Sequence, residues 1–339
     1  MNRELLKQAV GDFQKKFGSP HTVSAYAPGR VEILGNHTDY NDGFVLSSAI
    51  NFGIFFLAAK SKEKESRIFA GNMESESRFS INSIIPSQNE RWANYIKGVL
   101  AGLSQIKKPD SEFNALILGD IPLGSGLSSS AALEIASGLA LARMFDIKTD
   151  NITLAKIGQK AEHDFAGANC GLLDQISSIA GKEHKLVFTD FRTLEIKNIH
   201  MSSNVCFLVC HTDVKHAHVD NDYNERRREC EKAAHYFAGA LNHPVKALRD
   251  VRWDEWQEHS QKMDPMTAKR SAHPIGENAR VLRGIGFLEE DNIKEFGQLM
   301  YDSHQSSISY FENSCPELDF IVQTANDCGA YGARLSGGG

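Results

Sequence analysis

Pro122-Leu-Gly-Ser-Gly-Leu-Ser-Ser-Ser-Ala131 is the stretch that decides how the first half of this chain folds. It follows an apolar run at residues 113–118 and precedes a helical pattern at residues 131–145, so it predicts a turn from a strand into a helix. Gly124 and Gly126 permit positive φ angles and a close approach of the backbone to an anion. The serines then open the helix, where unpaired N–H groups and the helix dipole attract negative charge.

Two common nucleotide-binding patterns do not describe this loop. No lysine follows the glycines, so GxxxxGK[ST] is absent, and Ser129 stands where GxGxxG needs its third glycine. A dinucleotide-dependent oxidoreductase is therefore disfavoured. From the loop alone, a phosphate site and a serine-capped structural turn both remain open.

The predicted secondary structure changes from mixed strands and helices to mainly helices near residue 190. Strands are predicted before that point and helices dominate after Tyr223, which places two domains at residues 1–190 and 191–339. The predicted strands lie at residues 22–27, 44–60, 67–69, 78–81 and 113–118, with a hairpin at 185–199 and a buried strand at 205–212. The predicted helices lie at residues 91–103, 131–145, 153–165, 224–240, 253–262, 277–286, 292–309 and 316–328.

Composition narrows the class of protein. The chain has 339 residues, 41% of them hydrophobic and 24% charged, with a formal net charge of −6. An acidic chain is a poor nucleic-acid binder, and no apolar run of about 18 residues predicts a membrane span. The first 18 residues form an amphipathic pattern rather than a signal peptide, so a cytoplasmic protein is expected. The oligomeric state stays open, with a monomer slightly favoured.

Six scattered cysteines predict buried free thiols rather than a disulfide framework. A zinc site is the alternative, but Cys206 and Cys210 lie in an apolar run and have no second ligand pair nearby.

Three segments together resemble the GHMP kinases. The loop at 122–131 is similar to their second motif, and Gly332-Ala-Arg-Leu-Ser-Gly-Gly-Gly339 to the start of their third. Gly29-Arg-Val-Glu-Ile-Leu-Gly-Asn-His-Thr-Asp-Tyr-Asn41 is similar to the galactokinase signature, and Cys170-Gly-Leu-Leu-Asp-Gln175 agrees with it. The resemblance implies an α+β, two-domain GHMP kinase fold with the active site in the interdomain cleft. It also implies ATP and Mg²⁺ as cofactors and transfer of the γ-phosphate to the anomeric C1 hydroxyl of galactose or a close relative.

The resemblance assigns the catalytic pair to Asp174, as the base, and Arg30. A carboxylate can orient a hydroxyl and take its proton, while an arginine can keep that carboxylate ionised and offset charge on the phosphate. On residues alone, the N-cap of a helix at 175–180 is the favoured interpretation of Asp174, and only the resemblance makes it the base.

The family pattern also supplies metal and nucleotide positions. Glu162 and Ser130 match the Mg²⁺ ligands, although Glu162 alone would be read as an exposed helix residue. Trp92, together with Tyr95, matches a wall of the adenine site, with core packing as the alternative. The ATP-binding loop positions are Gly124, Ser125, Gly126, Leu127, Ser128, Ser129 and Ser130.

Four positions match sugar contacts of the family, namely His37, Asp39, Gly171 and Tyr223, and Asn36 occupies a fifth contact position with a different residue type. The Asp39 carboxylate can accept hydrogen bonds from two neighbouring sugar hydroxyls, and the Tyr223 phenol can pack against the amphipathic sugar ring. His37 taken alone would be a structural loop residue. The basic run Arg226–Arg228 is read as a solvated helix face, because acidic residues flank it at helical spacing.

The chain departs from the family pattern at two places. Asn36 replaces the usual glutamate, which the resemblance places near the sugar's C6 hydroxyl, so galacturonate or a 6-deoxy sugar is an alternative substrate. The sequence also stops at Gly339, inside the third motif, so an incomplete C-terminal domain is expected.

Two rival functions remain at this stage. A non-catalytic sugar and ATP sensor on the same fold is disfavoured because Arg30, Ser130, Glu162 and Asp174 are all present. A GHMP kinase for mevalonate or homoserine is disfavoured by HTDYN and CGLLDQ.

Overall fold

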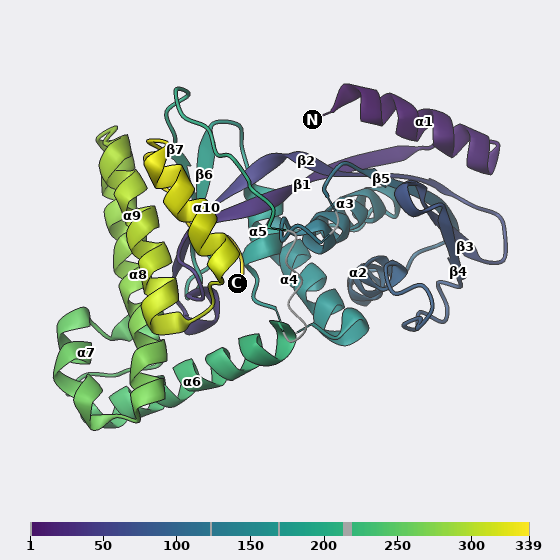
Figure 1. The fold of residues 1–339 in the computed structure, drawn as a ribbon. Helices are drawn as coiled ribbons and strands as arrows, with labels where there is room; N and C mark the ends of the chain where they lie inside the picture. Colours follow the sequence, from purple (N-terminus) through teal and green to yellow (C-terminus); the bar gives the residue numbers. More distant parts are fainter. Residues whose placement is uncertain (1, 123, 169, 213–218, 339) are drawn as a thin grey trace. The chain divides into compact units, whose positions relative to one another are not determined.

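The computed structural model describes residues 2–122, 124–168, 170–212 and 219–338 (Figure 1). The chain forms two compact units, one from Met1–Arg30 and Ala49–Ala180, the other from Val31–Ser48 and Gly181–Gly339. Most of the segment 29–41 therefore groups with the second half of the chain. The domain boundary expected near residue 190 stays a prediction.

Strands of the first unit are held mainly through β5, Phe113–Gly119. This strand runs antiparallel to the second part of β2, Phe44–Lys60, and parallel to β3, Ser66–Ala70, which pairs with β4, Ser75–Phe79. β1, Val23–Leu34, pairs with β2. Residues 54–59 of β2 are all buried, which is the pattern of a strand covered on both faces.

Helices cover both faces of these strands. Phe13 of α1, Arg3–Phe17, packs with Phe55, Leu57 and Leu116 from alternate positions of β2 and β5. Figure 1 shows α1 on one side of the strands and α2 and α3 on the other. The remaining helices of this unit are α2, Ala93–Ile106; α3, Ser129–Met144; α4, Asn151–Ala161; the π turn η3, Glu162–Ala166; and α5, Leu173–Ala180.

The second unit is mainly helical. Its hairpin, β6 Lys185–Asp190 and β7 Glu195–His200, pairs with the first part of β2. Its core holds Cys230, Phe237, Leu248 and Phe311. The helices are α6, Val219–Ala240; α7, Trp253–His259; α8, Pro265–Glu289; α9, Ile293–Ser306; and α10, Pro316–Asp327, with the π turn η6 at Ser307–Phe311 and 3-10 turns at Asp39–Asn41, Leu248–Asp250 and Ser260–Lys262.

Several predicted elements are confirmed, among them the hairpin at 185–199, the strand at 44–60 and the strand–loop–helix at 113–145. The buried strand predicted at 205–212 is wrong: these residues form no strand, and Leu208 is 86% exposed. An apolar run becomes a strand only where a neighbour supplies backbone hydrogen bonds, and none pairs with this segment in the described part of the chain. The helix predicted at 277–286 is part of the longer α8, which runs through Pro274.

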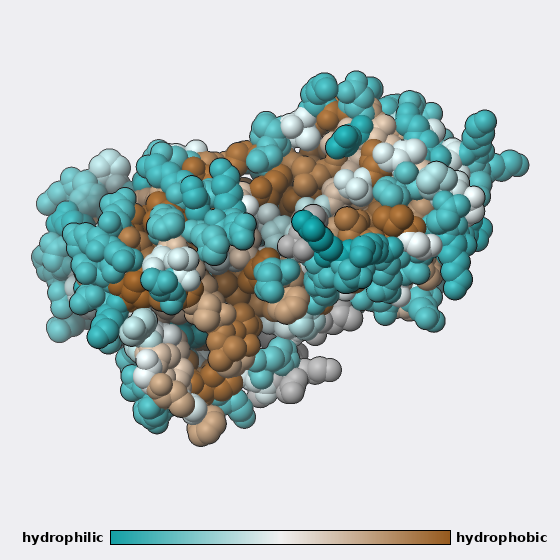
Figure 2. All heavy atoms as spheres, turned by 90° about the horizontal axis from the view of Figure 1, so that it is seen from above, coloured by the Kyte–Doolittle hydropathy of each residue, from teal (hydrophilic) through white to brown (hydrophobic). Residues whose placement is uncertain are grey.

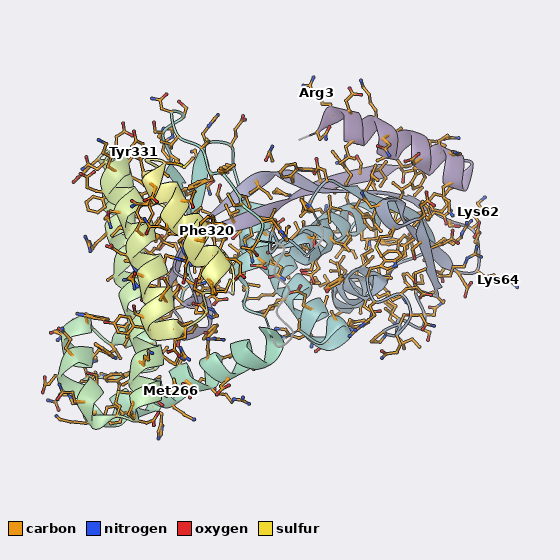
Figure 3. All side chains as sticks on the ribbon, in the orientation of Figure 1. Arg3, Lys62, Lys64, Met266, Phe320 and Tyr331 are labelled. Atoms are coloured by element: carbon orange, nitrogen blue, oxygen red, sulfur yellow. The ribbon has the colours of Figure 1, made fainter. Side chains whose placement is uncertain are left out.

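The cysteine prediction holds only in part. All six thiols are free, but only Cys230 is buried, while Cys206, Cys210 and Cys328 are exposed. Phe320 and Tyr331 also point outward (Figure 3), and hydrophobic side chains lie among hydrophilic ones on the face that Figure 2 shows. No helix among the described residues is long and apolar enough to cross a membrane.

Candidate active site

The glycine–serine loop has the predicted geometry. Gly124 and Gly126 both have φ of 70°, and α3 begins at Ser129. Ser128, just before the helix, has φ of 57°, which is unusual for a residue with a side chain. The described loop therefore turns a strand into a helix whose first N–H groups are unpaired, as an anion site requires.

At Arg30, the backbone of strand β1 contacts this loop. The Arg30 amide donates to the Leu127 carbonyl at 3.1 Å. Gly29 makes that approach possible, since a Cβ there would lie 2.5 Å from the same carbonyl oxygen. The position of Arg30 is thus set by backbone contact with the loop.

Arg30, Asp174 and Ser128 form one hydrogen-bonded group. Arg30 Nε donates to Asp174 Oδ1 at 2.7 Å, and Ser128 Oγ donates to Asp174 Oδ2 at 2.5 Å. A second Arg30 nitrogen, Nη1, donates to the Gly126 carbonyl at 2.7 Å. Asp174 is the second residue of α5, and its carboxylate bonds to other elements, so it is not the N-cap that the sequence left open.

This geometry suits a carboxylate that receives a proton. Arg30 holds Asp174 Oδ1 and Ser128 holds Oδ2, so both oxygens of the carboxylate are oriented. The Asp174 side chain remains 24% exposed, whereas that of Arg30 is 8% exposed. Asp174 can therefore accept a further hydrogen bond from a bound hydroxyl.

Glu162 is not the exposed helix residue that the sequence alone suggested. It is 6% exposed and opens the π turn η3, a feature often found at functional sites. Its Oε2 accepts from the Cys170 thiol at 2.6 Å and from Gln175 Nε2 at 3.3 Å. Ser130, in the first turn of α3, is half-buried.

The charges around Glu162 fit a divalent cation. Burial, followed by the negative charge of Glu162, raises the pKa of Glu134 well above its usual value, and the same two causes raise the pKa of Cys170. Buried negative charge of this kind is stabilised by a cation, and Mg²⁺ prefers such hard oxygen ligands. The described residues contain no group of three or more His, Cys, Asp or Glu able to hold a metal ion.

Sequence reasoning missed Glu134 and Gln175. Glu134 is fully buried on α3 and receives a hydrogen bond from Gln175 Nε2 at 2.9 Å. Its spacing of four residues from Ser130 places both on one face of the helix, so helical periodicity could have identified it.

The residues matched to the adenine site lie at the start of α2. Trp92 directly precedes this helix, is half-buried and donates from Nε1 to Ser75 Oγ at 3.2 Å. Burial, then the charges of Glu162 and Glu134, raises the pKa of Tyr95. Their contact with adenine stays a prediction.

The loop that follows β1 in the second unit is held by buried polar groups. Asn36 is 1% exposed, and its Nδ2 donates to the Gly337 carbonyl at 2.7 Å. Its Oδ1 accepts a hydrogen bond from Asn313 Nδ2 at 3.1 Å and also lies 3.3 Å from His273 Nε2. The backbone amide of Asn36 donates to Glu277 Oε2 at 3.1 Å. Both ends of the Asn36 amide therefore have protein partners.

His37 is neutral in this loop. Burial lowers the pKa of His37 to about 3. Nε2 lies 3.2 Å from the Gly338 carbonyl, which can only accept, so Nε2 carries the hydrogen and Nδ1 accepts from the Tyr40 hydroxyl at 2.8 Å.

The other predicted sugar contacts are less clustered. Asp39 opens the 3-10 turn after His37 and is half-buried. Gly171 belongs to the first unit, in the turn before α5. Tyr223 lies in α6, but its side chain is outside the described residues.

The prediction of a solvated basic face needs correction at Arg226. This side chain donates to the carbonyls of Phe311 at 3.1 Å and Glu312 at 2.7 Å, where η6 ends. It satisfies carbonyls that a helix end leaves unpaired, whereas Arg228 is exposed as predicted.

Comparison with known proteins decides the family. The galactokinase galactose-binding signature matches residues 11–60, the GHMP kinases N terminal domain residues 94–182, and the GHMP kinases C terminal domain residues 285–339. The chain is 38% identical to a galactokinase of Haemophilus influenzae, over 98% of this chain and 87% of that protein. It is 39% identical to a galactokinase of Actinobacillus succinogenes, over 96% of this chain and 85% of that protein.

The chain belongs to the galactokinase family.

The fold predicted from the motifs is confirmed. The crystal structure of Lactococcus lactis galactokinase complexed with galactose matches with a TM-score of 0.89 and 29% identity, covering 98% of this chain and 87% of that one. The mevalonate kinase of Methanococcus jannaschii shares the fold alone, with a TM-score of 0.60 and 19% identity over 95% of this chain and 88% of that one. As a galactokinase family member, the chain is a kinase that transfers phosphate to a sugar hydroxyl and takes ATP as its phosphate donor.

Proposed function

We propose that this chain transfers the γ-phosphate of ATP to the C1 hydroxyl of galactose, giving galactose 1-phosphate and ADP. The observation that carries the proposal is the Arg30–Asp174–Ser128 group, held against a glycine–serine loop that opens a helix. Family membership and the galactose-binding signature at residues 11–60 support the choice of sugar.

In this proposal Asp174 accepts the proton of the sugar hydroxyl while that oxygen bonds to the γ-phosphorus and the bond to ADP breaks. Arg30 pairs with Asp174 and fixes its Oδ1, leaving Oδ2 to act beside Ser128. The N–H groups of the loop and of the first turn of α3 neutralise charge on the phosphates. The positions from Gly124 to Ser130 serve this role, with Trp92 beside the adenine.

The residues of the first unit also fit Mg²⁺, which when bound neutralises charge on the phosphate oxygens. Glu162 and Ser130 would hold the ion. Glu162 supplies a hard carboxylate oxygen, and its negative charge helps to raise the pKa of Glu134 and of the Cys170 thiol beside it.

For the sugar, we assign contacts to Asp39, Gly171 and Tyr223. His37 has a supporting role in the loop, because both of its ring nitrogens are bonded inside the protein, to Tyr40 and Gly338. The described network of Asn36 argues against a role in choosing the C6 substituent, because its Oδ1 and Nδ2 are both bonded inside the protein. Galacturonate and 6-deoxy sugars are accordingly not favoured. Neither is a non-catalytic sensor, since Arg30, Asp174 and Ser128 are hydrogen-bonded to one another beside the loop.

The test is a coupled ADP-release assay with ATP, Mg²⁺ and a panel of galactose, N-acetylgalactosamine, galacturonate, fucose, arabinose and glucose. Galactose should give the highest kcat/KM. Asp174→Asn should lower kcat by about 100-fold or more, the usual contribution of a positioned base.

A matched control is Asp164→Asn, which changes an exposed aspartate that pairs with Lys160 and should leave kcat unchanged. Binding of galactose without ADP release by the wild type would favour the sensor and contradict the proposal.

A further inference from the structure

Two acidic side chains of the first unit are buried without charged donors. Glu134 is fully buried and Glu162 is 6% exposed. In the described part of the chain their side-chain donors are neutral, namely the Cys170 thiol and the Gln175 amide. A buried carboxylate is costly unless its oxygens are hydrogen-bonded, so the orientation of these few donors decides where each carboxylate lies.

Gln175 is the group that the two acids share. Its Nε2 donates to Glu134 Oε2 at 2.9 Å and to Glu162 Oε2 at 3.3 Å, one hydrogen for each. Its orientation is assigned from this contact, because a carbonyl oxygen turned toward the Glu162 carboxylate would meet an acceptor. Gln175 is itself fully buried, so water does not compete at this point.

A glycine on the neighbouring helix leaves room for the contact between Gln175 and Glu134. Gly158 of α4 faces it, and a Cβ there would lie 3.0 Å from Glu134 Oε2 and 3.1 Å from Gln175 Cγ. Gln175 also directly follows Asp174 on α5, and successive helical residues project about 100° apart. The same turn of helix thus presents Asp174 to Arg30 and Gln175 to the two acids.

We propose that Gln175 is a positioning residue for phosphoryl transfer: its amide fixes the Glu162 carboxylate and ties it to the helix that carries Asp174. It touches neither substrate and acts through Glu162. The inference rests on the proposed function, because Glu162 is there the ligand of the divalent cation. The separation between the base and the metal ligand is then set by one short helix.

The first variant is Gln175→Met, which keeps the chain length and removes the donor. Electron paramagnetic resonance of Mn²⁺ in the presence of ADP measures the bound ion directly, without turnover. The dissociation constant of Mn²⁺ should rise about tenfold, as it does when partners of metal ligands are removed, and the galactose KM should change less than twofold. Gln159→Met is the control, since Gln159 Nε2 donates to the Cys170 carbonyl, which His163 also contacts.

A swap separates positioning from packing. In the double variant Glu134→Gln/Gln175→Glu, the amide at position 134 and the carboxylate at position 175 again face each other. Glu162, however, now faces the new carboxylate at position 175 in place of an amide donor. Compared with Gln175→Glu alone, the swap should recover the midpoint of thermal unfolding and leave the Mn²⁺ dissociation constant raised.

The inference is wrong if Gln175→Met binds Mn²⁺ as the wild type does and loses only thermal stability. It is also wrong if the swap restores Mn²⁺ binding together with stability. Failure of the proposed function is a separate result, because it would appear as a wild type that releases no ADP with galactose.

Discussion

Substituting Gly29 by alanine tests whether backbone contact with the loop sets the position of Arg30. Gly29 has no left-handed φ, so alanine is allowed by its backbone and the whole cost is steric. The new Cβ would lie 2.5 Å from the Leu127 carbonyl oxygen, 3.1 Å from Ile121 Cδ1 and 3.2 Å from Ile50 Cδ1. Contacts below about 3 Å are not tolerated, so strand and loop must separate by about half an ångström or more.

That separation should cost both stability and rate. Overpacking of this kind destabilises by about 1–3 kcal/mol. The 3.1 Å bond from the Arg30 amide to Leu127 is stretched, and the side chain that holds Asp174 moves with it. Since a displacement of about 1 Å can cost about 100-fold in rate, we expect kcat to fall between 10-fold and 100-fold.

The assay is ADP release with galactose, together with thermal unfolding. Gly11→Ala is the matched control, because nothing lies within 4 Å of a Cβ at Gly11 in helix α1. It should stabilise the protein by about 0.5–1 kcal/mol and leave kcat unchanged. If Gly29→Ala keeps the wild-type kcat, the loop contact does not position Arg30 and the reasoning fails.

Three further changes have defined outcomes. Arg30→Lys keeps the positive charge, but a lysine cannot reach Asp174 and the Gly126 carbonyl together. We therefore expect kcat to fall at least about tenfold, with little change in the unfolding midpoint. An unchanged kcat would show that the charge alone is sufficient. Glu277→Gln removes the buried charge that pairs with Arg280, so the free energy of unfolding measured in urea should fall by about 3 kcal/mol. A loss below about 1 kcal/mol would contradict a stabilising role for this ion pair. Burial acts to raise the pKa of Glu76, but hydrogen bonds from basic residues outweigh it and lower the pKa to about 2. Its stabilisation is therefore present above pH ~4.5 and lost as the pH falls toward 2. Glu76→Gln should accordingly cost on the order of 1 kcal/mol at pH 7, with the difference from wild type vanishing near pH 2; a difference independent of pH would refute this.

The local features of the fold were predictable because they depend on neighbouring residues. Hydrophobic patterning gave the strand at 113–118, the turn and the helix from 131, and the two glycines of the loop adopt the positive φ angles that their lack of a side chain permits. The run at 205–212 shows the limit of this reasoning, since its apolar side chains do not determine whether another strand pairs with it.

The assembly of the site was not predictable from spacing. Arg30 and Asp174 are separated by 144 residues, and only the resemblance joined them before the structure did. Gln175 ends one quoted motif and Glu134 follows another, but their contact depends on how two helices pack. Asn36 looked like a specificity residue because the family pattern has a glutamate there, whereas its burial and its partners at Asn313 and Gly337 depend on distant parts of the chain.

The central claim is that phosphate is transferred from ATP to the C1 hydroxyl of galactose. Phosphorus-31 NMR of the reaction of the wild-type chain with ATP, Mg²⁺ and galactose tests it most directly, with Asp174→Asn as the comparison. We predict one new phosphomonoester signal, coupled to the anomeric proton and formed at the same rate as ADP, that Asp174→Asn produces about 100-fold more slowly or not at all. A signal coupled to the C6 protons, or ADP formed with no sugar phosphate, would contradict the account.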